Sequence, residues 1–143
     1  MKIITKKHIG VYGIIIKNNN VALIKKAIGG YKGKLDLPGG GMEHGESAIE
    51  TLKRELMEEA GVLVKRAHLL DVVTYTFKWQ MEEDVIENLH HIGILYVIDE
   101  FENELKSEPD NIDSLGCSWY QIDKLNQNEI TPFAKLALEK ITK

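Results

Sequence analysis

The segment from Ser47 to Gly61 constrains the fold of this chain most, because it specifies an amphipathic helix together with both of its ends. Ser47 followed three residues later by Glu50 forms a capping box. Gly61 is the residue type that most often follows a helix C-terminus. At about 100° per residue, one apolar stripe forms along this segment, from Ala48, Ile49, Leu52, Leu56 and Ala60. The pattern predicts a helix over residues 47–60 with one face packed against a core.

Three glutamates border that apolar stripe. Measured from Leu52, Glu59, Glu55 and Glu58 lie at roughly −20°, −60° and −120°, so they share one edge of the helix. Like charges at this spacing repel by a few tenths of a kcal/mol per pair, at roughly 0.2–0.5. A divalent cation is the simplest way to offset the repulsion, although a solvated acidic face is the plain alternative.

Hard cations are bound by carboxylate oxygens, and Mg²⁺ takes few protein ligands alongside substrate phosphates. A metal held in this way polarises phosphoryl oxygens and lowers the pKa of bound water, and a nearby glutamate can accept the proton. Pro38 and the glycines at 39–41 precede the helix. Glycine allows close backbone approach, so a carbonyl from this stretch can complete the metal shell. Water attack on a phosphoanhydride is the reaction class that these residues favour.

The composition is that of one globular domain. The chain has 143 residues, 43% hydrophobic and 28% charged, with a net charge of −4, which argues against a nucleic-acid partner. Cys117 is the single cysteine, so an internal disulfide is excluded and a reducing compartment is expected. The apolar run from Ile9 to Ile16 is too short to cross a bilayer. We therefore expect a cytoplasmic protein without a membrane partner.

Runs of β-branched and apolar residues predict strands between these features. The expected strands are His8–Ile16, Val21–Lys25, an extended segment over Val62–Phe77, Leu89–Ile98 and Gly116–Gln121. Residues 18–20 are predicted to form a turn, and residues 80–88 and 101–113 to form loops. Thr131 and Pro132 open a second helix. Strands and helices mix without regular alternation, which predicts one mixed sheet covered by helices.

The spacing of the helix motif identifies a family resemblance. Gly40, Glu46, Arg54-Glu55-Leu56, Glu58-Glu59 and Gly61-Val62 stand at the positions of a complete Nudix box, and residues 37–40 resemble the usual lead-in. The resemblance implies a Nudix fold, an α/β/α sandwich around a mixed β-sheet, formed here by a single domain over residues 1–143. It also implies hydrolysis of a nucleoside diphosphate linked to another moiety, dependent on Mg²⁺ or Mn²⁺.

The same resemblance implies roles for individual residues. Glu55, Glu58 and Glu59 would be metal ligands and catalytic groups, with Glu55 an alternative general base. The backbone carbonyl of Gly39 or Gly40 would be a further ligand, and Glu46 and Arg54 would form a structural ion pair. A carboxylate from outside the motif often joins the site in this family, and its candidates here are Glu82, Glu83, Asp84 and Glu87.

Substrate identity is less constrained. The chain lacks the signatures associated with ADP-ribose, dinucleoside polyphosphate and coenzyme A members, which leaves a (deoxy)nucleoside triphosphate as the favoured substrate. A nucleoside diphosphate sugar, or a non-catalytic nucleotide-binding module, are the alternatives. Lys32, Lys34 and His44 are candidates for phosphate contact, although a solvated loop explains them too. Tyr75, Phe77 and Trp79 alternate on one strand face, and they could stack on a base or simply pack. A homodimer is also compatible with a β-rich domain of this size.

Overall fold

The structure is a computed structural model that describes residues 1–106 and 114–142. The chain forms β1 (Lys2–Ile14), β2 (Ile16–Lys17), β3 (Asn20–Lys26), β4 (Leu35–Asp36), β5 (Gly39–Gly41), α1 (Ala48–Ala60), β6 (Leu63–Glu82), β7 (Val85–Glu102), β8 (Ser114–Gln121), the 3-10 turns Ile122–Lys124 and Gln127–Glu129, and α2 (Pro132–Ile141). The order confirms the predicted mixture of strands and helices.

Within the described residues the strands form two sheets. The first has the order β5-β1-β7-β6, and the second has β2-β3-β4 with β8 also paired to β3. β1 runs parallel to β7, while β5 and β6 are antiparallel to their neighbours. The first sheet is therefore mixed, as the sequence predicted.

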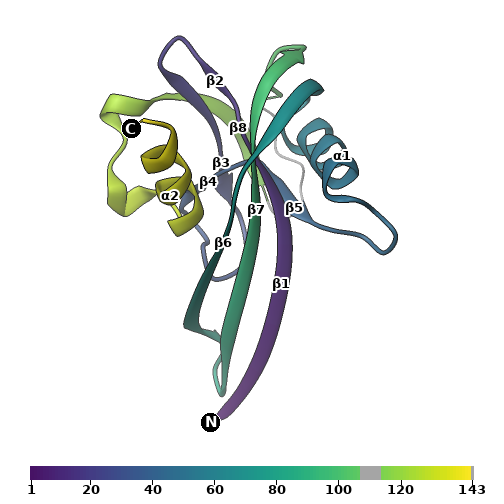
Figure 1. Ribbon diagram of the computed structural model, residues 1–143. Coiled ribbons are helices and arrows are strands. Elements are labelled where there is room, and N and C mark those ends of the chain that lie inside the picture. The colour runs from purple at the N-terminus through teal and green to yellow at the C-terminus, as the bar shows by residue number, and fades with distance from the viewer. Residues whose placement is uncertain (107–113, 143) are drawn as a thin grey trace.

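Side chains of the central strands alternate between two cores. On β1, Tyr12 and Ile14 belong to the core under α2, whereas Val11 and Ile15 belong to the core under α1. Successive strand residues point to opposite faces, so each strand supplies both cores. α1 and α2 consequently cover opposite sides of the strands, which gives the α/β/α layering (Figure 1).

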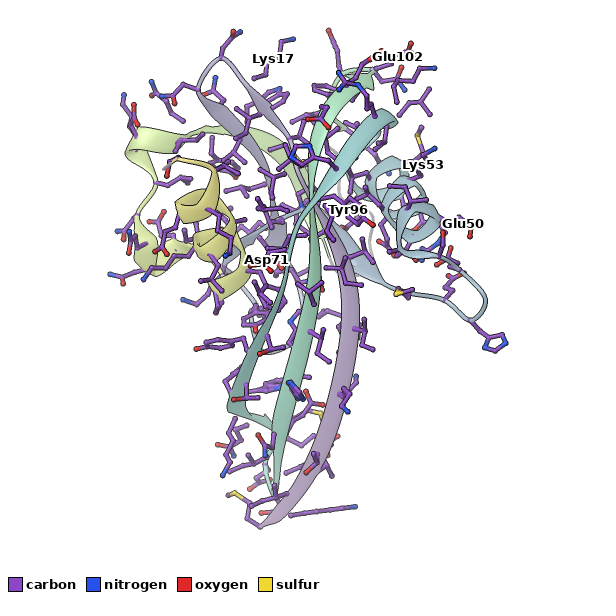
Figure 2. The ribbon with its side chains drawn as sticks, in the orientation of Figure 1. Lys17, Glu50, Lys53, Asp71, Tyr96 and Glu102 are labelled. Atoms are coloured by element: carbon purple, nitrogen blue, oxygen red, sulfur yellow. The ribbon has the colours of Figure 1, made fainter. Side chains whose placement is uncertain are left out.

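The helix boundaries follow their predicted caps. Ser47 accepts a hydrogen bond from the Glu50 amide, the Glu50 carboxylate accepts one from the Ser47 amide, and Gly61 adopts φ 71°. Glu50 and Lys53 point away from the sheet (Figure 2). α2 begins at Pro132 after the N-cap Thr131. No helix among the described residues is long and apolar enough to cross a membrane.

β1, β6 and β7 continue past the body of the protein as a long arm (Figure 1). The prediction of a loop over residues 80–88 was wrong, because β6 runs to Glu82 and β7 starts at Val85 after a tight turn. The N-terminal end of β1 pairs with this region from Lys2 opposite Val85, which also explains why β1 begins before His8. Acidic composition suggested a loop, but pairing with neighbouring strands decided the structure.

The extended segment predicted over residues 62–77 belongs to a single strand, β6, whose pairing with β7 shifts register at several points. Of the loop predicted over residues 101–113, Phe101 and Glu102 belong to β7. Residues 107–113 lie outside the described residues.

Candidate active site

The glycine strand β5 lies between β1 and the acidic edge of α1. Gly39 pairs with Tyr12 on β1 and has φ 146°, and its amide donates to Glu59 Oε1 at 2.7 Å. A Cβ at Gly39 would lie 2.1 Å from the Val11 carbonyl oxygen. Glu59 is only 3% exposed. The lack of a side chain at residue 39 therefore lets this backbone fit between β1 and a buried carboxylate.

Gly40 leaves room for a second carboxylate, that of Glu55, to lie against the backbone of β5. A Cβ there would lie 2.6 Å from the Glu55 carboxylate. The Glu55 side chain is 15% exposed, whereas that of Glu58 is 55% exposed. The degree of burial follows the angle around the helix, since Glu59 lies nearest the apolar stripe and Glu58 farthest from it.

Arg54 connects the helix to the loop before it. Its Nε and Nη2 donate to the two oxygens of Glu46 at 2.7 and 2.9 Å. Nη2 also donates to the Gly41 carbonyl at 3.0 Å, and Nη1 donates to Glu55 Oε1 at 2.8 Å. Hydrogen bonding from Arg54 lowers the pKa of Glu46 to about 2. Nη1 also donates to Glu58 Oε2 at 3.4 Å. The guanidinium thus holds the loop, the glycine strand and two helix carboxylates in a single network.

The donor atoms at this site fit a divalent cation that is completed by substrate and water. The residues that the structure describes contain no ready-made cluster of three or more His, Cys, Asp or Glu side chains. Mg²⁺ usually takes only one or two protein carboxylates together with waters and phosphates, so such a cluster is not required. Glu55 and Glu59 both reach β5, and their carboxylate oxygens with the β5 carbonyls are a hard donor set that suits Mg²⁺ or Mn²⁺.

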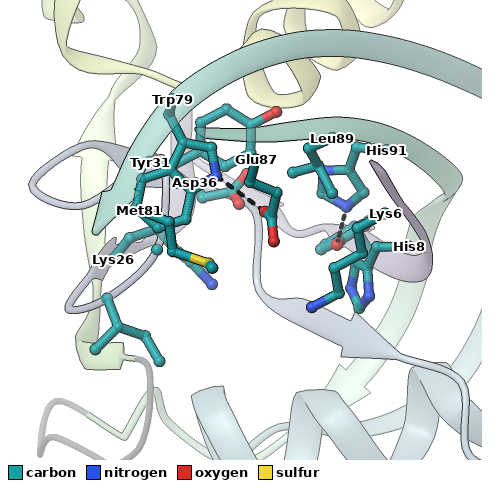
Figure 3. A pocket seen from close by; sticks show the side chains of 14 residues that line it. Lys6, His8, Lys26, Tyr31, Asp36, Trp79, Met81, Glu87, Leu89 and His91 are labelled. Carbon is teal, nitrogen blue, oxygen red and sulfur yellow. Dashed lines mark hydrogen bonds between the residues drawn. The ribbon is translucent and has the colours of Figure 1, made fainter. Parts of the chain in front are cut away.

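A cavity of about 350 Å³ opens beside β5, between the arm and the segment that follows β3 (Figure 3). It is lined by Lys6, His8, Tyr12, Lys26, Ile28, Gly29, Gly30, Tyr31, Asp36, Trp79, Met81, Glu87, Leu89 and His91. Apolar walls with a few polar groups are typical of small-molecule sites.

His8 connects this cavity to the glycine strand. It lines the cavity, and a Cβ on Gly41 would lie 3.0 Å from its ring. Beside it, His91 Nε2 and the Tyr12 hydroxyl share a hydrogen bond of 2.7 Å. Burial, and then the nearby His8 and Lys26, lower the pKa of His91 to about 3, so that its imidazole is neutral at pH 7.

A buried carboxylate, that of Glu87, lies at the end of the cavity away from His8 and His91. Glu87 is 7% exposed, and its Oε1 accepts a hydrogen bond from the Trp79 indole at 2.9 Å. Asp36, also buried, accepts hydrogen bonds from the Thr131 hydroxyl at 2.6 Å and from the Leu37 amide at 2.8 Å. The cavity thus combines acidic groups with the cationic side chains of Lys6 and Lys26.

Most of the other sequence candidates lie elsewhere. Of the six residues suggested for substrate contact, Trp79 lines the cavity, and the other five do not: Lys32, Lys34, His44, Tyr75 and Phe77. Lys34 donates to the Asn128 carbonyl at 3.0 Å, and Phe77 stacks on Tyr31 at a centroid distance of 4.8 Å. Phe77 therefore supports a lining residue from behind.

The four candidate extra carboxylates lie at two different places along the arm. Glu82, Glu83 and Asp84 surround the β6–β7 turn at its tip, away from α1, whereas Glu87 lies inside the cavity (Figures 1 and 3).

Sequence reasoning missed most of the cavity residues. One signal was present in the first strand, where Lys6, His8 and Tyr12 occupy alternate positions and therefore share a face. No comparable signal marks Lys26, Tyr31 or Asp36, which come from separate segments.

Comparisons with known proteins agree with this geometry. A family model described as NUDIX domain matches residues 6–141. An ADP-ribose pyrophosphatase of Methanocaldococcus jannaschii is 36% identical over 102 residues, covering 71% of this chain and 56% of that protein. An 8-oxo-dGTP diphosphatase of Proteus vulgaris is 32% identical over 101 residues, covering 70% of this chain and 82% of that protein. The chain thus spans little more than half the length of the first of these relatives.

A solved structure gives the same result for the fold. The MutT NUDIX hydrolase from Burkholderia pseudomallei superposes with a TM-score of 0.77 at 27% identity, covering 95% of this chain and 98% of that one. The chain belongs to the NUDIX family, and its α/β/α architecture is that of MutT-like Nudix hydrolases.

Proposed function

We propose that this protein is a Mg²⁺-dependent pyrophosphohydrolase that cleaves a phosphoanhydride bond of a (deoxy)nucleoside triphosphate. One observation carries the proposal. The glycine strand β5 is held against two helix carboxylates, Glu55 and Glu59, and its neighbours His8 and Tyr12 line a cavity of about 350 Å³. The proposed unit is a single domain over residues 1–143.

The metal site would use the carboxylates of Glu55, Glu58 and Glu59 with the backbone carbonyl of Gly39 or Gly40. When bound there, Mg²⁺ (or Mn²⁺ as a substitute) supplies Lewis-acid polarisation of a phosphoryl oxygen and a more acidic bound water. Burial of Glu59 and partial burial of Glu55 favour strong charge interactions at this position.

The protein side chains have distinct tasks in this proposal. Glu55 or Glu59 accepts the proton of the attacking water, a role typically worth about 10²–10⁴-fold. Arg54 positions Glu55 and Gly41 without touching the substrate, since its own hydrogen bonds are made within the protein. Lys6 and Lys26 line the cavity and offer positive charge to the phosphates.

The names of the relatives support a nucleotide substrate. One is called an 8-oxo-dGTP diphosphatase and the other an ADP-ribose pyrophosphatase. A nucleoside diphosphate sugar or a related diphosphate is therefore the second candidate. A non-catalytic nucleotide-binding module is disfavoured by the complete set of helix glutamates. The proposal includes no nucleic-acid partner, and a homodimer is compatible with it and is checked by light scattering.

The proposal is tested with Glu59→Gln. The amide oxygen of glutamine can still accept the Gly39 amide, so we expect a folded protein with turnover lowered by at least about 10²-fold. Release of phosphate and pyrophosphate is measured over a panel of nucleotides, with and without Mg²⁺. Glu100→Gln, an exposed substitution on β7, is the matched control. Undiminished turnover in Glu59→Gln, or hydrolysis that does not need a divalent metal, would refute the assigned roles.

A further inference from the structure

β6 leaves one side of the arm without a neighbouring strand. It is the last strand of its sheet and pairs with β7 alone among the described residues (Figure 1). Its pairing with β7 shifts register before Val72 and again after Gln80, but it is regular over residues 72–80. Along this stretch, which we call the outer edge, alternate residues point their backbone N–H and C=O groups away from β7. These groups are available to a further strand.

The outer edge lacks the features that usually protect an exposed strand. It reads Val-Val-Thr-Tyr-Thr-Phe-Lys-Trp-Gln, in which Lys78 is the one charged residue and proline is absent. β-branched and aromatic residues favour strands. Natural proteins usually interrupt exposed edges with charges, bulges or proline, because an uninterrupted edge pairs with other chains. The composition of the outer edge therefore favours association.

Other exposed stretches of the same sheet do carry such protection. β5 covers β1 only at Gly10–Tyr12, so residues 2–9 also lack a neighbour on that side within the described chain. That edge carries Lys2, Lys6 and Lys7. The part of β6 before the outer edge is broken by three register shifts. The contrast between the two sides of the arm indicates that the outer edge is used for pairing.

The residues of the outer edge are complementary to the same residues in reverse order. In an antiparallel pairing centred on Thr76, this residue would face the partner's Thr76. Tyr75 would face the partner's Phe77, and Val73 would face the partner's Trp79. Thr–Thr, aromatic–aromatic and aromatic–β-branched pairs are among the cross-strand pairs that stabilise sheets. The sequence of the outer edge thus suits a second copy of itself.

This register also suits the charge and the length of the outer edge. Lys78 would face the partner's Thr74, so like charges do not oppose each other. All of residues 72–80 would be paired, which gives roughly eight to ten backbone hydrogen bonds in the antiparallel pattern. A specific protein interface typically contains about 10 ± 5 direct hydrogen bonds. The outer edge is therefore long enough to hold two chains together.

We propose that the outer edge is a homodimer interface, in which β6 pairs antiparallel with the partner's β6 around a twofold axis at Thr76. A twofold axis uses the same surface on both copies, so the assembly closes at two chains. The pairing would cover Tyr75, which is 39% exposed. The interface adjoins the cavity, because Phe77 stacks on Tyr31 and Trp79 lines the cavity wall.

The test is the oligomeric state of the full chain, measured by sedimentation velocity and light scattering over a dilution series. We expect a dimer that dissociates on dilution. Thr74→Glu places a carboxylate opposite the partner's Lys78 twice in each dimer, and should tighten the dissociation constant by about 2–30-fold. Thr76→Glu opposes two carboxylates on the axis and should weaken it by about twofold or more. Both threonines are exposed, so the two variants add the same charge without disturbing the core.

A third variant and a control complete the experiment. Tyr75→Ala removes two aromatic pairs from the dimer and should weaken it by about 5–150-fold. Thr5→Glu, at an exposed threonine on the β1 side of the arm, should leave the dissociation constant unchanged. Circular dichroism melts check that each variant folds. A wild-type chain that stays monomeric throughout the series would overturn the inference. So would a dimer that Thr74→Glu and Thr76→Glu change in the same direction or not at all, since its interface lies elsewhere.

Discussion

The neighbouring glycines of β5 provide a sharp prediction, because alanine at each position should fail for a different reason. A Cβ at Gly40 would lie 2.6 Å from the Glu55 carboxylate, which must retreat by roughly 0.8 Å to reach ordinary contact at 3.4 Å. Displacement of a reacting group by about 1 Å can cost about 10²-fold in rate. We therefore expect Gly40→Ala to lower kcat/KM by about 10²-fold, or about 2.7 kcal/mol of barrier.

The stability of Gly40→Ala should stay near that of the wild type. The obstructing atoms belong to the end of the Glu55 side chain, which is flexible and 15% exposed. Alanine also reduces the entropy of the unfolded chain, worth about 0.4–1 kcal/mol in favour of folding. The midpoint of thermal unfolding should consequently shift by no more than about 4 °C.

Gly39→Ala should instead destabilise the fold. Its φ of 146° is unfavourable for alanine, and its Cβ would meet the Val11 carbonyl oxygen at 2.1 Å. Backbone atoms cannot move aside as a side chain can, so we expect a loss of at least about 1–3 kcal/mol and a melting point lowered by about 4 °C or more. Circular dichroism melts and Mg²⁺-dependent product release measure both variants. A Gly40→Ala enzyme within threefold of wild type, or a Gly39→Ala protein of unchanged stability, would contradict this reasoning.

The remaining predictions concern stability. Leu56 lies on the buried face of α1 and is fully buried, so Leu56→Ala should reduce the free energy of unfolding in urea by about 2–5 kcal/mol. Met57→Ala, at an exposed neighbour, should change it by less than about 0.5 kcal/mol, and equal effects would disprove the packing argument. The pKa of His91 lies below its unfolded value of 6.5, so the unfolded state binds the proton first as pH falls. Stability should therefore be lost from pH 6.5 downward toward pH 3, by about 2 kcal/mol between pH 7 and pH 5. His91→Gln should lack this component, and identical pH slopes for the two proteins would refute it.

Local signals determined much of this protein in advance. The caps of α1, Ser47 and Gly61, act on backbone groups within one helical turn, so the sequence alone locates the helix. The order of burial among Glu59, Glu55 and Glu58 follows from helix geometry. Runs of β-branched and apolar residues predicted the central strands, because strand propensity is also a local property. The irregular mixture of strands and helices along the chain predicted the mixed sheet.

The strands of the arm could not be predicted from local sequence, because they depend on pairing between residues that are far apart in the chain. Residues 80–88 are acidic and polar, a composition typical of loops, yet they pair into β6 and β7 because strand pairing with β1 supplies hydrogen bonds that composition does not reveal. The same pairing decides the position of each acidic side chain. It leaves Glu83 at the tip of the arm and buries Glu87, although the two residues are only four positions apart in the sequence.

The cavity belongs entirely to the tertiary structure. Tyr12, Lys26, Asp36, Trp79 and His91 come from five different strands. They meet only because β1 runs parallel to β7 and β4 pairs back onto β3. A sequence motif can specify a helix and the carboxylates on it, because the spacing of residues along a helix fixes which side chains share a face. A pocket between strands depends on register and on which side of each strand faces inward, and these are settled only when the sheets and helices pack together.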